Sequence, residues 1–155
     1  MIIIGYPGIG KSTLAGRYKE YIDLESSNWN NIDNTKPDNW WWSYGRVAED
    51  LSRQGYRVFV SCHPQVQKYF EESTEYVMVC YPSLHMKDDW TLKLAQRYKE
   101  DRSMKNLAAL NNVDLFYDKQ IKELNKSKFK HKCVLEDMNY TLDTEIDKVL
   151  WGQQK

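Results

Sequence analysis

The sequence predicts an α/β fold in which helices cover a parallel sheet of about five strands. Short apolar runs alternate with helix-like segments along the whole chain, which is typical of strands joined by helical crossovers. The run 76–81 (YVMVCY) is continuously apolar, as in strands that are covered on both faces. No linker or repeat divides the 155 residues, so a single domain over 1–155 is expected.

Five strands are expected, each set between polar or glycine-rich segments. They are 2–4, 21–23, 56–61, 76–81 and 133–135. The first ends at Gly5, the second at Asp23 and the third at Ser61. Because the carboxyl ends of parallel strands face the ligand crevice of an α/β sheet, these three positions are candidates for a binding site.

The expected helices alternate with these strands. They are 11–19, 38–54, a short helix after Pro64, a helix from near Trp90, a helical stretch through 107–124, and 142–151. Gly55 closes the second helix as a C-cap. Apolar residues in 107–124 repeat at three-, four- and seven-residue spacings, which indicates a core-facing stripe. The polar stretches 26–39 and 83–105 are interpreted as insertions over one sheet.

Composition excludes several classes of protein. The formal net charge is 0, so nothing favours broad binding to nucleic acid or to a membrane surface. The apolar runs are far shorter than the roughly 18 residues of a membrane span, and no signal peptide is visible. Cys62, Cys80 and Cys133 show no CxxC spacing and are expected to be buried, reduced thiols. We therefore expect a cytoplasmic protein without nucleic-acid or membrane partners.

Residues 5–12 read GYPGIGKS and match the pattern G-x-x-x-x-G-K-[ST] completely. Glycines let the loop turn its N–H groups inward onto phosphate oxygens. Lys11 supplies a cation for the β- and γ-phosphates, and Ser12 offers a hydroxyl to Mg²⁺. We therefore expect ATP and Mg²⁺ as cofactors, with Ser12 as the metal ligand. The expected nucleotide contacts are Gly8, Ile9, Gly10, Lys11, Ser12 and Thr13.

Together with this motif, three positional features resemble P-loop kinases of the nucleoside and nucleoside-monophosphate kinase type. They are YIDLESS, YRVFVSCH and the basic helical segment WTLKLAQRYKEDR. The resemblance spans most of the chain, and GYPGIGKST is its specific part. It implies a three-layer sandwich of the P-loop NTPase type, with ATP on the loop and a small-molecule phosphate acceptor over the carboxyl ends of the strands. It also implies a small helical lid that closes on the phosphates.

The chain departs from this family at two places. The third expected strand ends in Ser61, where a Walker B strand usually carries an acid, so Asp23 becomes the main acidic candidate. Asp23 is expected to deprotonate or orient the acceptor, or to hold Mg²⁺ through water. Glu25, on the same strand edge, is a further acceptor contact. For both residues the alternative is a helix cap or a solvated turn. The lid lacks dense arginine pairs, which argues against adenylate kinase.

The lid is expected over about 83–105. Lys93 and Arg97 are four residues apart and share a helix face, and Arg102 follows. A guanidinium meets two phosphate oxygens at once, so Arg97 is the catalytic candidate and Lys93 a substrate contact. A solvated charged helix is the alternative. With few apolar anchors, this segment is expected to be mobile and to close on nucleotide.

The aromatic segment, about 26–50, is expected to cover the acceptor. Three successive tryptophans, 40–42, cannot all face the core, so at least one is expected to be partly exposed or to line a cleft. Trp42 is a candidate for stacking on a base, and Arg46 for meeting an acceptor phosphate. Core packing or the contact of a homodimer is the alternative.

Polar residues also follow the third strand. Ser61 and His63 are candidates for contact with a γ-phosphate. Cys62 and His63 are adjacent on the strand and point in opposite directions, which excludes a Cys–His dyad.

These observations support two hypotheses. The first is an ATP-dependent phosphotransferase acting on a nucleoside, nucleotide or nucleotide-like small molecule. The alternative is a nucleotide-binding regulatory or interaction protein without phosphotransfer, which the missing Walker B acid favours. Asp23 and the lid cations favour the first. The sequence leaves the acceptor and the oligomeric state open, and zero net charge weakens a third reading, a polynucleotide-end kinase.

Overall fold

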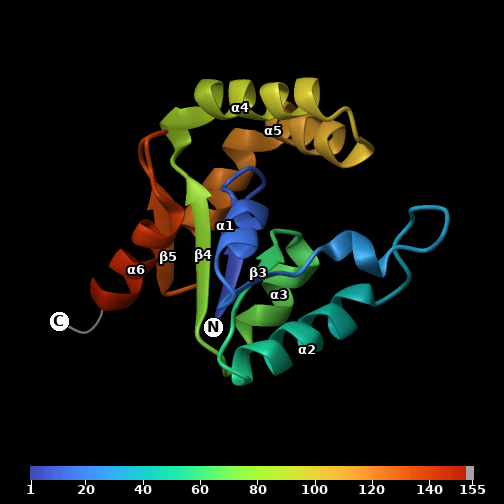
Figure 1. The fold of residues 1–155 in the computed structure, drawn as a ribbon, viewed down its shortest axis with the longest axis vertical. Coiled ribbons are helices and arrows are strands. Elements are labelled where there is room, and N and C mark those ends of the chain that lie inside the picture. Colours follow the sequence, from blue (N-terminus) through green and yellow to red (C-terminus); the bar gives the residue numbers. More distant parts are fainter. Residues whose placement is uncertain (153–155) are drawn as a thin grey trace.

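Five parallel strands form one sheet in the computed structural model, which describes residues 1–152 (Figure 1). The strands are β1 (Ile2–Gly5), β2 (Tyr21–Asp23), β3 (Arg57–Ser61), β4 (Val77–Pro82) and β5 (His131–Leu135). Their order across the sheet is β2-β3-β1-β4-β5, so β1 is central and pairs with β3 and β4. The predicted five-stranded parallel sheet is confirmed.

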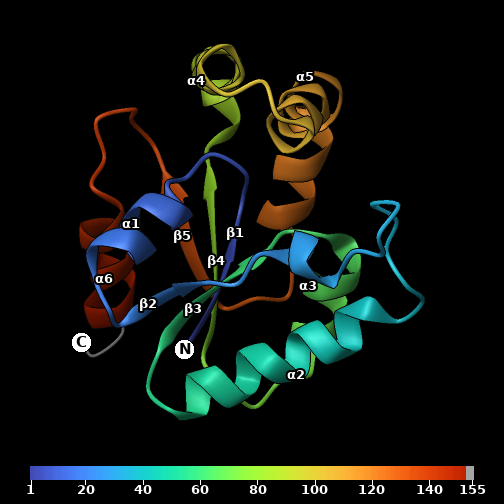
Figure 2. The ribbon, with the colours of Figure 1, turned by 45° about the vertical axis from the view of Figure 1, so that its right-hand side comes forward.

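Helices cover both faces of this sheet and give it three layers. They are α1 (Lys11–Arg17), α2 (Trp40–Arg53), α3 (Pro64–Glu71), α4 (Lys87–Glu100), α5 (Met104–Asn125) and α6 (Leu142–Gly152), with short 3₁₀ turns η1 (Ser26–Trp29) and η2 (Leu84–Met86). From β1 to β2 the chain moves across the sheet in one direction, and from β2 through β3 and β4 to β5 it moves in the opposite direction. Because the crossovers are right-handed, α1 lies on one face of the sheet and α2, α3 and α5 lie on the other. Figure 2 shows α6 beside α1, and α4 beyond the carboxyl ends of the strands.

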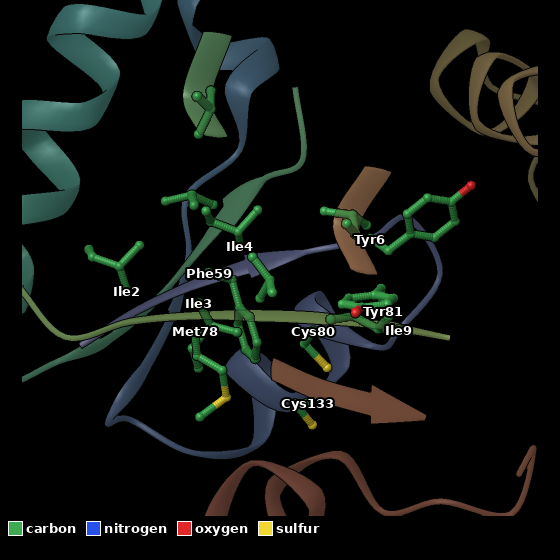
Figure 3. Packing of buried hydrophobic residues seen from close by; sticks show 14 of the residues in the cluster. Ile2, Ile3, Ile4, Tyr6, Ile9, Phe59, Met78, Cys80, Tyr81 and Cys133 are labelled. Carbon is green, nitrogen blue, oxygen red and sulfur yellow. The ribbon is translucent and has the colours of Figure 1, made fainter. Parts of the chain in front are cut away.

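The central strand is fully enclosed. Ile2, Ile3 and Ile4 are at most 1% exposed, and each fully buried side chain of this size contributes about 1.5–3 kcal/mol. Figure 3 shows Ile2 and Ile4 on one side of the sheet and Ile3 on the other, where its register partners Phe59 and Met78 lie. This packing makes the carboxyl end of β1 a rigid support for the segment that follows it.

Helix boundaries differ from the expected ones where single residues change the backbone. The first helix ends at Arg17 instead of residue 19, because Tyr18 is extended (φ −126°, ψ 131°) and leads toward β2. The second helix begins at Trp40 instead of residue 38, because Asn39 adopts a left-handed conformation with φ 57°. The apolar spacing in the sequence predicts which residues of these helices are buried, but not where the helices begin and end.

The segment 83–105 is anchored more firmly than expected. It consists of η2, α4 and the start of α5. Met86, Trp90 and Leu94 are buried, so the expectation of few apolar anchors is wrong for α4. The polar part of the segment is the turn at 101–103 between α4 and α5. That the segment closes on a nucleotide stays a prediction.

All three cysteines are free thiols. Cys80 and Cys133 are buried and face each other in register on β4 and β5, whereas Cys62 is only partly buried at the end of β3. Within residues 1–152, none of the helices combines the length and the apolar character that crossing a bilayer requires.

The contact between α2 and α3 supplies a test of the packing. A Cβ on Gly45 would overlap the ring of Tyr69, so Gly45→Ala is expected to lower the free energy of unfolding by about 1–3 kcal/mol. Gly16 lies in α1 with open space around its Cα, and Gly16→Ala is expected to raise stability by about 0.5–1 kcal/mol. Urea denaturation measures both, and equal effects would contradict the packing described.

Candidate active site

The loop between β1 and α1 is shaped by two glycines with left-handed backbones. Gly8 has φ 92° and Gly10 has φ 106°, values that other L-residues rarely adopt. A Cβ on Gly8 would lie 2.9 Å from Cδ2 of Leu94 and 3.2 Å from Nε1 of Trp90. Conformation and space therefore both require glycine at position 8, in agreement with the role expected from the motif.

Side chains from outside the loop hold it in place. The indole N–H of Trp90 donates to the carbonyl oxygen of Pro7 at 2.8 Å, and the hydroxyl of Tyr140 donates to the carbonyl oxygen of Ile9 at 2.8 Å. The Trp90 and Tyr140 rings are stacked with centroids 6.2 Å apart. Tyr140 follows β5 at the same edge of the sheet, so the loop is fixed by two segments distant in sequence.

Lys93 joins this aromatic pair. Its Nζ donates to Oη of Tyr140 at 2.7 Å and lies 4.5 Å from the centre of the Trp90 ring. Burial lowers the pKa of Lys93 to about 8, and the nearby positive charge of Arg97 acts in the same direction. The structure thus brings Lys93 close to the side chains that hold the loop, and puts its ammonium group where an added anion would restore the ordinary pKa.

Lys11 lies at the mouth of the loop. Its Nζ donates to the carbonyl oxygen of Gly5 at 3.2 Å. Burial lowers the pKa of Lys11, and the negative charge of Asp23 opposes that change. Ser12 and Thr13 follow at the start of α1, where both are exposed. Lys11 and Ser12 thus stand directly after the loop, at the start of α1.

Two carboxylates lie at the end of β2. Burial raises the pKa of Asp23 to about 6, the charge of Lys11 opposes this, and the charge of Glu25 and a hydrogen bond with it reinforce the rise. Burial alone would raise the pKa of Glu25, but the ammonium group of Lys105 lowers it. Nζ of Lys105 is 2.6 Å from Oε1 of Glu25. The pair Asp23–Glu25 thus contains one proton-accepting carboxylate of raised pKa and one that is ion-paired.

Lys105 is a residue that sequence reasoning missed. It lies in the first turn of α5, eighty positions from Glu25, and its charge acts on both Lys11 and Asp23. Nothing in its local sequence distinguishes it from the other lysines of the chain. Lys105 is near the loop only because the fold brings the start of α5 to the end of β2.

The end of β3 meets the same edge through a buried tyrosine. The hydroxyl of Tyr44 donates to the carbonyl oxygen of Leu24 at 2.6 Å and accepts from the N–H of Ser61 at 2.8 Å. Nδ1 of His63 lies 2.7 Å from Oγ of Ser61, whereas Cys62 contacts Gln67. As predicted, His63 does not pair with Cys62.

A cavity of about 470 Å³ opens beside the loop. Its walls come from the ends of β1 and β3, the start of α3 and one face of α5. Residues that define it include Tyr6, Lys11, Ser61, His63, Asn112 and Phe116. This volume is within the range of small-molecule sites. The aromatic segment 26–50 contributes none of the lining residues, and α5 borders this cavity instead.

Several expected contacts are not brought to this cavity. Of the three tryptophans, Trp40 is 6% exposed and Trp42 is 51% exposed, which confirms that they cannot all face the core. Arg46 lies 4.8 Å from the ring centre of Trp42. Trp42 lines a separate groove between α2 and α3, so the pair faces away from the loop.

The expected lid arginines also lie apart from the loop. Nη2 of Arg97 donates to Oδ1 of Asn106 at 3.1 Å and thereby joins α4 to α5. Arg102 is exposed on the turn between the two helices. In contrast, Lys93 bonds to Tyr140, which holds the loop, and the charge of Lys105 acts on Lys11.

The protein oxygens near the loop fit Mg²⁺ only in part. Within residues 1–152, no group of three or more His, Cys, Asp or Glu side chains is arranged to hold a metal ion. Magnesium commonly keeps several waters and takes one or two protein oxygens together with phosphate oxygens. The exposed hydroxyl of Ser12 suits that pattern, and it would hold the ion together with the phosphates of a bound nucleotide.

A comparison of the chain with models of known protein families gives no match, and a comparison with curated proteins gives none either.

The raised pKa of Asp23 makes stability depend on pH. The folded protein holds this proton more tightly than the unfolded chain, whose ordinary value is 3.8. The contribution of Asp23 to the free energy of unfolding therefore falls as pH rises from about 4 to about 6. Asp23→Asn removes this charge, and at pH 8 it is expected to stabilise the protein by about 1–3 kcal/mol, with little effect at pH 4. Urea denaturation at both values measures the change.

The control for this prediction is Asp38→Asn, which alters an exposed carboxylate before α2. It is expected to give the same small effect at both pH values. An Asp23→Asn effect that does not change between pH 4 and pH 8 would contradict a buried, proton-binding carboxyl.

Proposed function

We propose that the protein is an ATP-dependent phosphotransferase that acts on a nucleoside, nucleotide or nucleotide-like small molecule. The observation that carries the proposal is the loop 5–12. It joins left-handed glycines to Lys11 at the carboxyl end of the central strand, and it borders a cavity large enough for a second substrate. The resemblance to P-loop kinases supports the same function.

The residues of the chain divide the work as follows. Backbone N–H groups of the loop hold the β-phosphate, and Lys11 spans the β- and γ-phosphates. Lys93 adds charge from the side of α4 and Lys105 from the side of α5. Bound Mg²⁺ would draw charge from the phosphate oxygens. Asp23 accepts the proton of an acceptor hydroxyl, a role that suits a carboxylate whose pKa of about 6 is near the working pH.

One observation favours the alternative of a nucleotide-binding regulatory protein. The central region lacks an acidic residue at the end of β3, where Ser61 stands. His63, which follows two residues later, is no substitute for an acidic residue. Burial and the charges of Lys36 and Lys11 lower the pKa of its ring. A screen for transfer of labelled γ-phosphate from ATP over nucleosides, nucleotides and sugars separates the two functions.

Binding of ATP with Mg²⁺ is expected to depend on Lys11. Lys11→Ala removes a charge-assisted contact that contributes about 1.5–3 kcal/mol, so the affinity for ATP is expected to fall by at least tenfold. Calorimetric titration measures it. Lys19→Ala, which removes an exposed lysine after α1, is the matched control. Equal affinities in the wild type and in Lys11→Ala would remove the basis of the proposal.

Turnover is expected to depend on Asp23. With any acceptor that the screen identifies, Asp23→Asn should lower kcat by about 10²–10⁴, the usual loss for a positioned general base. Its affinity for ATP should stay within a factor of about three, because the loop is intact. Asp38→Asn should retain wild-type turnover. A near wild-type rate in Asp23→Asn would show that another group takes the proton.

A further inference from the structure

The wall that α5 gives to the cavity is built from amides and an aromatic ring. The side chains of Asn112 and Gln120 bond reciprocally, with both N···O distances at 3.0 Å. The hydroxyl of Tyr6 donates to Oε1 of Gln120 at 2.9 Å. This network fixes the orientation of both amides, and each amide group still has an N–H that these bonds do not use. The cavity therefore presents fixed, uncharged hydrogen-bonding groups.

Apolar surface stands beside these amides. Phe116 lines the cavity, although its side chain is not packed into the core and is 48% exposed. Ala108 and Ala109 line it about two turns before Phe116 in α5 and leave space because they are small. A ring face beside fixed donors and acceptors suits a flat heterocycle that carries its own polar edge.

The charge of the cavity is unsuited to a second phosphate group. Apart from Lys11, which the nucleotide engages, its lining carries one cation and one anion, Lys119 and Glu123, four residues apart on α5. None of the chain's six arginines lines it. A phosphate monoester carries nearly two negative charges and is usually met by arginine or by several cations. No such group faces this space.

The arginines are instead engaged or exposed elsewhere. Arg57 pairs with Asp147 at 2.7 Å and Arg53 with Asp50 at 2.7 Å. Arg46 stacks on Trp42 and Arg97 bonds to Asn106. The remaining two, Arg17 and Arg102, are exposed.

The carboxylate at the end of β2 also favours an acceptor that carries no phosphate group. A phosphate monoester is already ionised at neutral pH and attacks without a base, whereas an alcohol must lose a proton in the reaction. Asp23 does not line the cavity, but it lies close enough to Lys11, which does, for their charges to interact, and a carboxylate there can accept that proton.

From this arrangement we propose that the α5 cavity binds an unphosphorylated nucleoside as the acceptor, with its base between Phe116 and the Asn112–Gln120 amide pair. This inference rests on the proposed phosphotransferase function and narrows it. The hydroxyl oxygen of the nucleoside forms a bond to the γ-phosphorus of ATP, and the bond from that phosphorus to the β–γ bridging oxygen breaks. The hydroxyl proton passes to the Asp23 carboxylate, and ADP leaves with the electron pair.

Transfer from γ-labelled ATP tests this, with thymidine, deoxyadenosine, deoxycytidine, deoxyguanosine and their 5′-monophosphates as acceptors. At least one nucleoside is expected to be phosphorylated at least tenfold faster than its monophosphate. Faster transfer to monophosphates would overturn the inference while leaving the phosphotransferase function intact. If no acceptor is used and calorimetry detects no nucleoside binding, the inference fails. Loss of Lys11-dependent ATP binding would instead refute the proposed function.

Two neighbouring asparagines provide a matched pair of variants. Asn112→Leu removes the cavity amide and is expected to raise KM for the nucleoside at least tenfold, with KM for ATP unchanged. Asn111→Leu alters an exposed asparagine outside the cavity lining and should change neither constant. Equal nucleoside KM values in the two variants would overturn the assignment of the amide pair.

A second pair guards against a folding defect in Asn112→Leu. Phe116→Ala should raise KM for the nucleoside, whereas Leu115→Ala, which alters a side chain 69% exposed outside the cavity lining, should not. No difference between these two would count against the stacking position.

Discussion

The left-handed backbone at Gly8 and Gly10 is the constraint on which the carboxyl edge of the sheet depends. It turns the chain sharply after a strand that is buried on both faces, and the carbonyl groups of Pro7 and Ile9 bond to side chains from outside the loop. Both carbonyls find partners from other elements, Trp90 and Tyr140. A loop held by its strand, by its backbone conformation and by two ring side chains is preorganised, so little ordering remains to oppose binding of an anion.

The helices α4 and α5 connect the two sides of this loop. Trp90 and Leu94 of α4 pack against it from one side, and Asn112 and Phe116 of α5 border the cavity on the other. The bond between Arg97 and Asn106 joins the two helices. The connection from β4 to β5 therefore contacts the loop through α4 and borders the cavity through α5.

Sequence reasoning succeeded where the signal is short in range. Apolar runs identified the strands, and the spacing of glycines and Lys11 identified the loop, because both depend on neighbouring residues. Trp42 and Arg46, expected to contact the acceptor, lie outside the lining of the cavity beside the loop. The spacing of Trp40, Tyr44 and Ala48, all buried, shows which side of α2 faces the sheet, and Trp42 and Arg46 lie on the other side.

The remaining groups depend on tertiary packing. Lys105 meets Glu25 only because the turn after α4 brings the start of α5 over the end of β2. The amides of α5 face the cavity because a stripe of Val113, Tyr117 and Ile121 is buried against the core. Tyr140 had a usable signal, since it follows the last strand at the carboxyl edge. Lys105, Asn112 and Gln120 had none.

The ion pair between Glu25 and Lys105 is an exposed electrostatic contact, unlike the ring packing and hydrogen bonds that hold the loop at this edge of the sheet. Its side chains are 32% and 58% exposed, and attraction between exposed charges weakens as salt screens it, over about 8–10 Å at physiological ionic strength. Packing of Trp90 against the loop has no such dependence. Dissolved salt therefore weakens the link between β2 and α5, whereas the backbone of the loop, held by Trp90 and Tyr140, keeps its conformation.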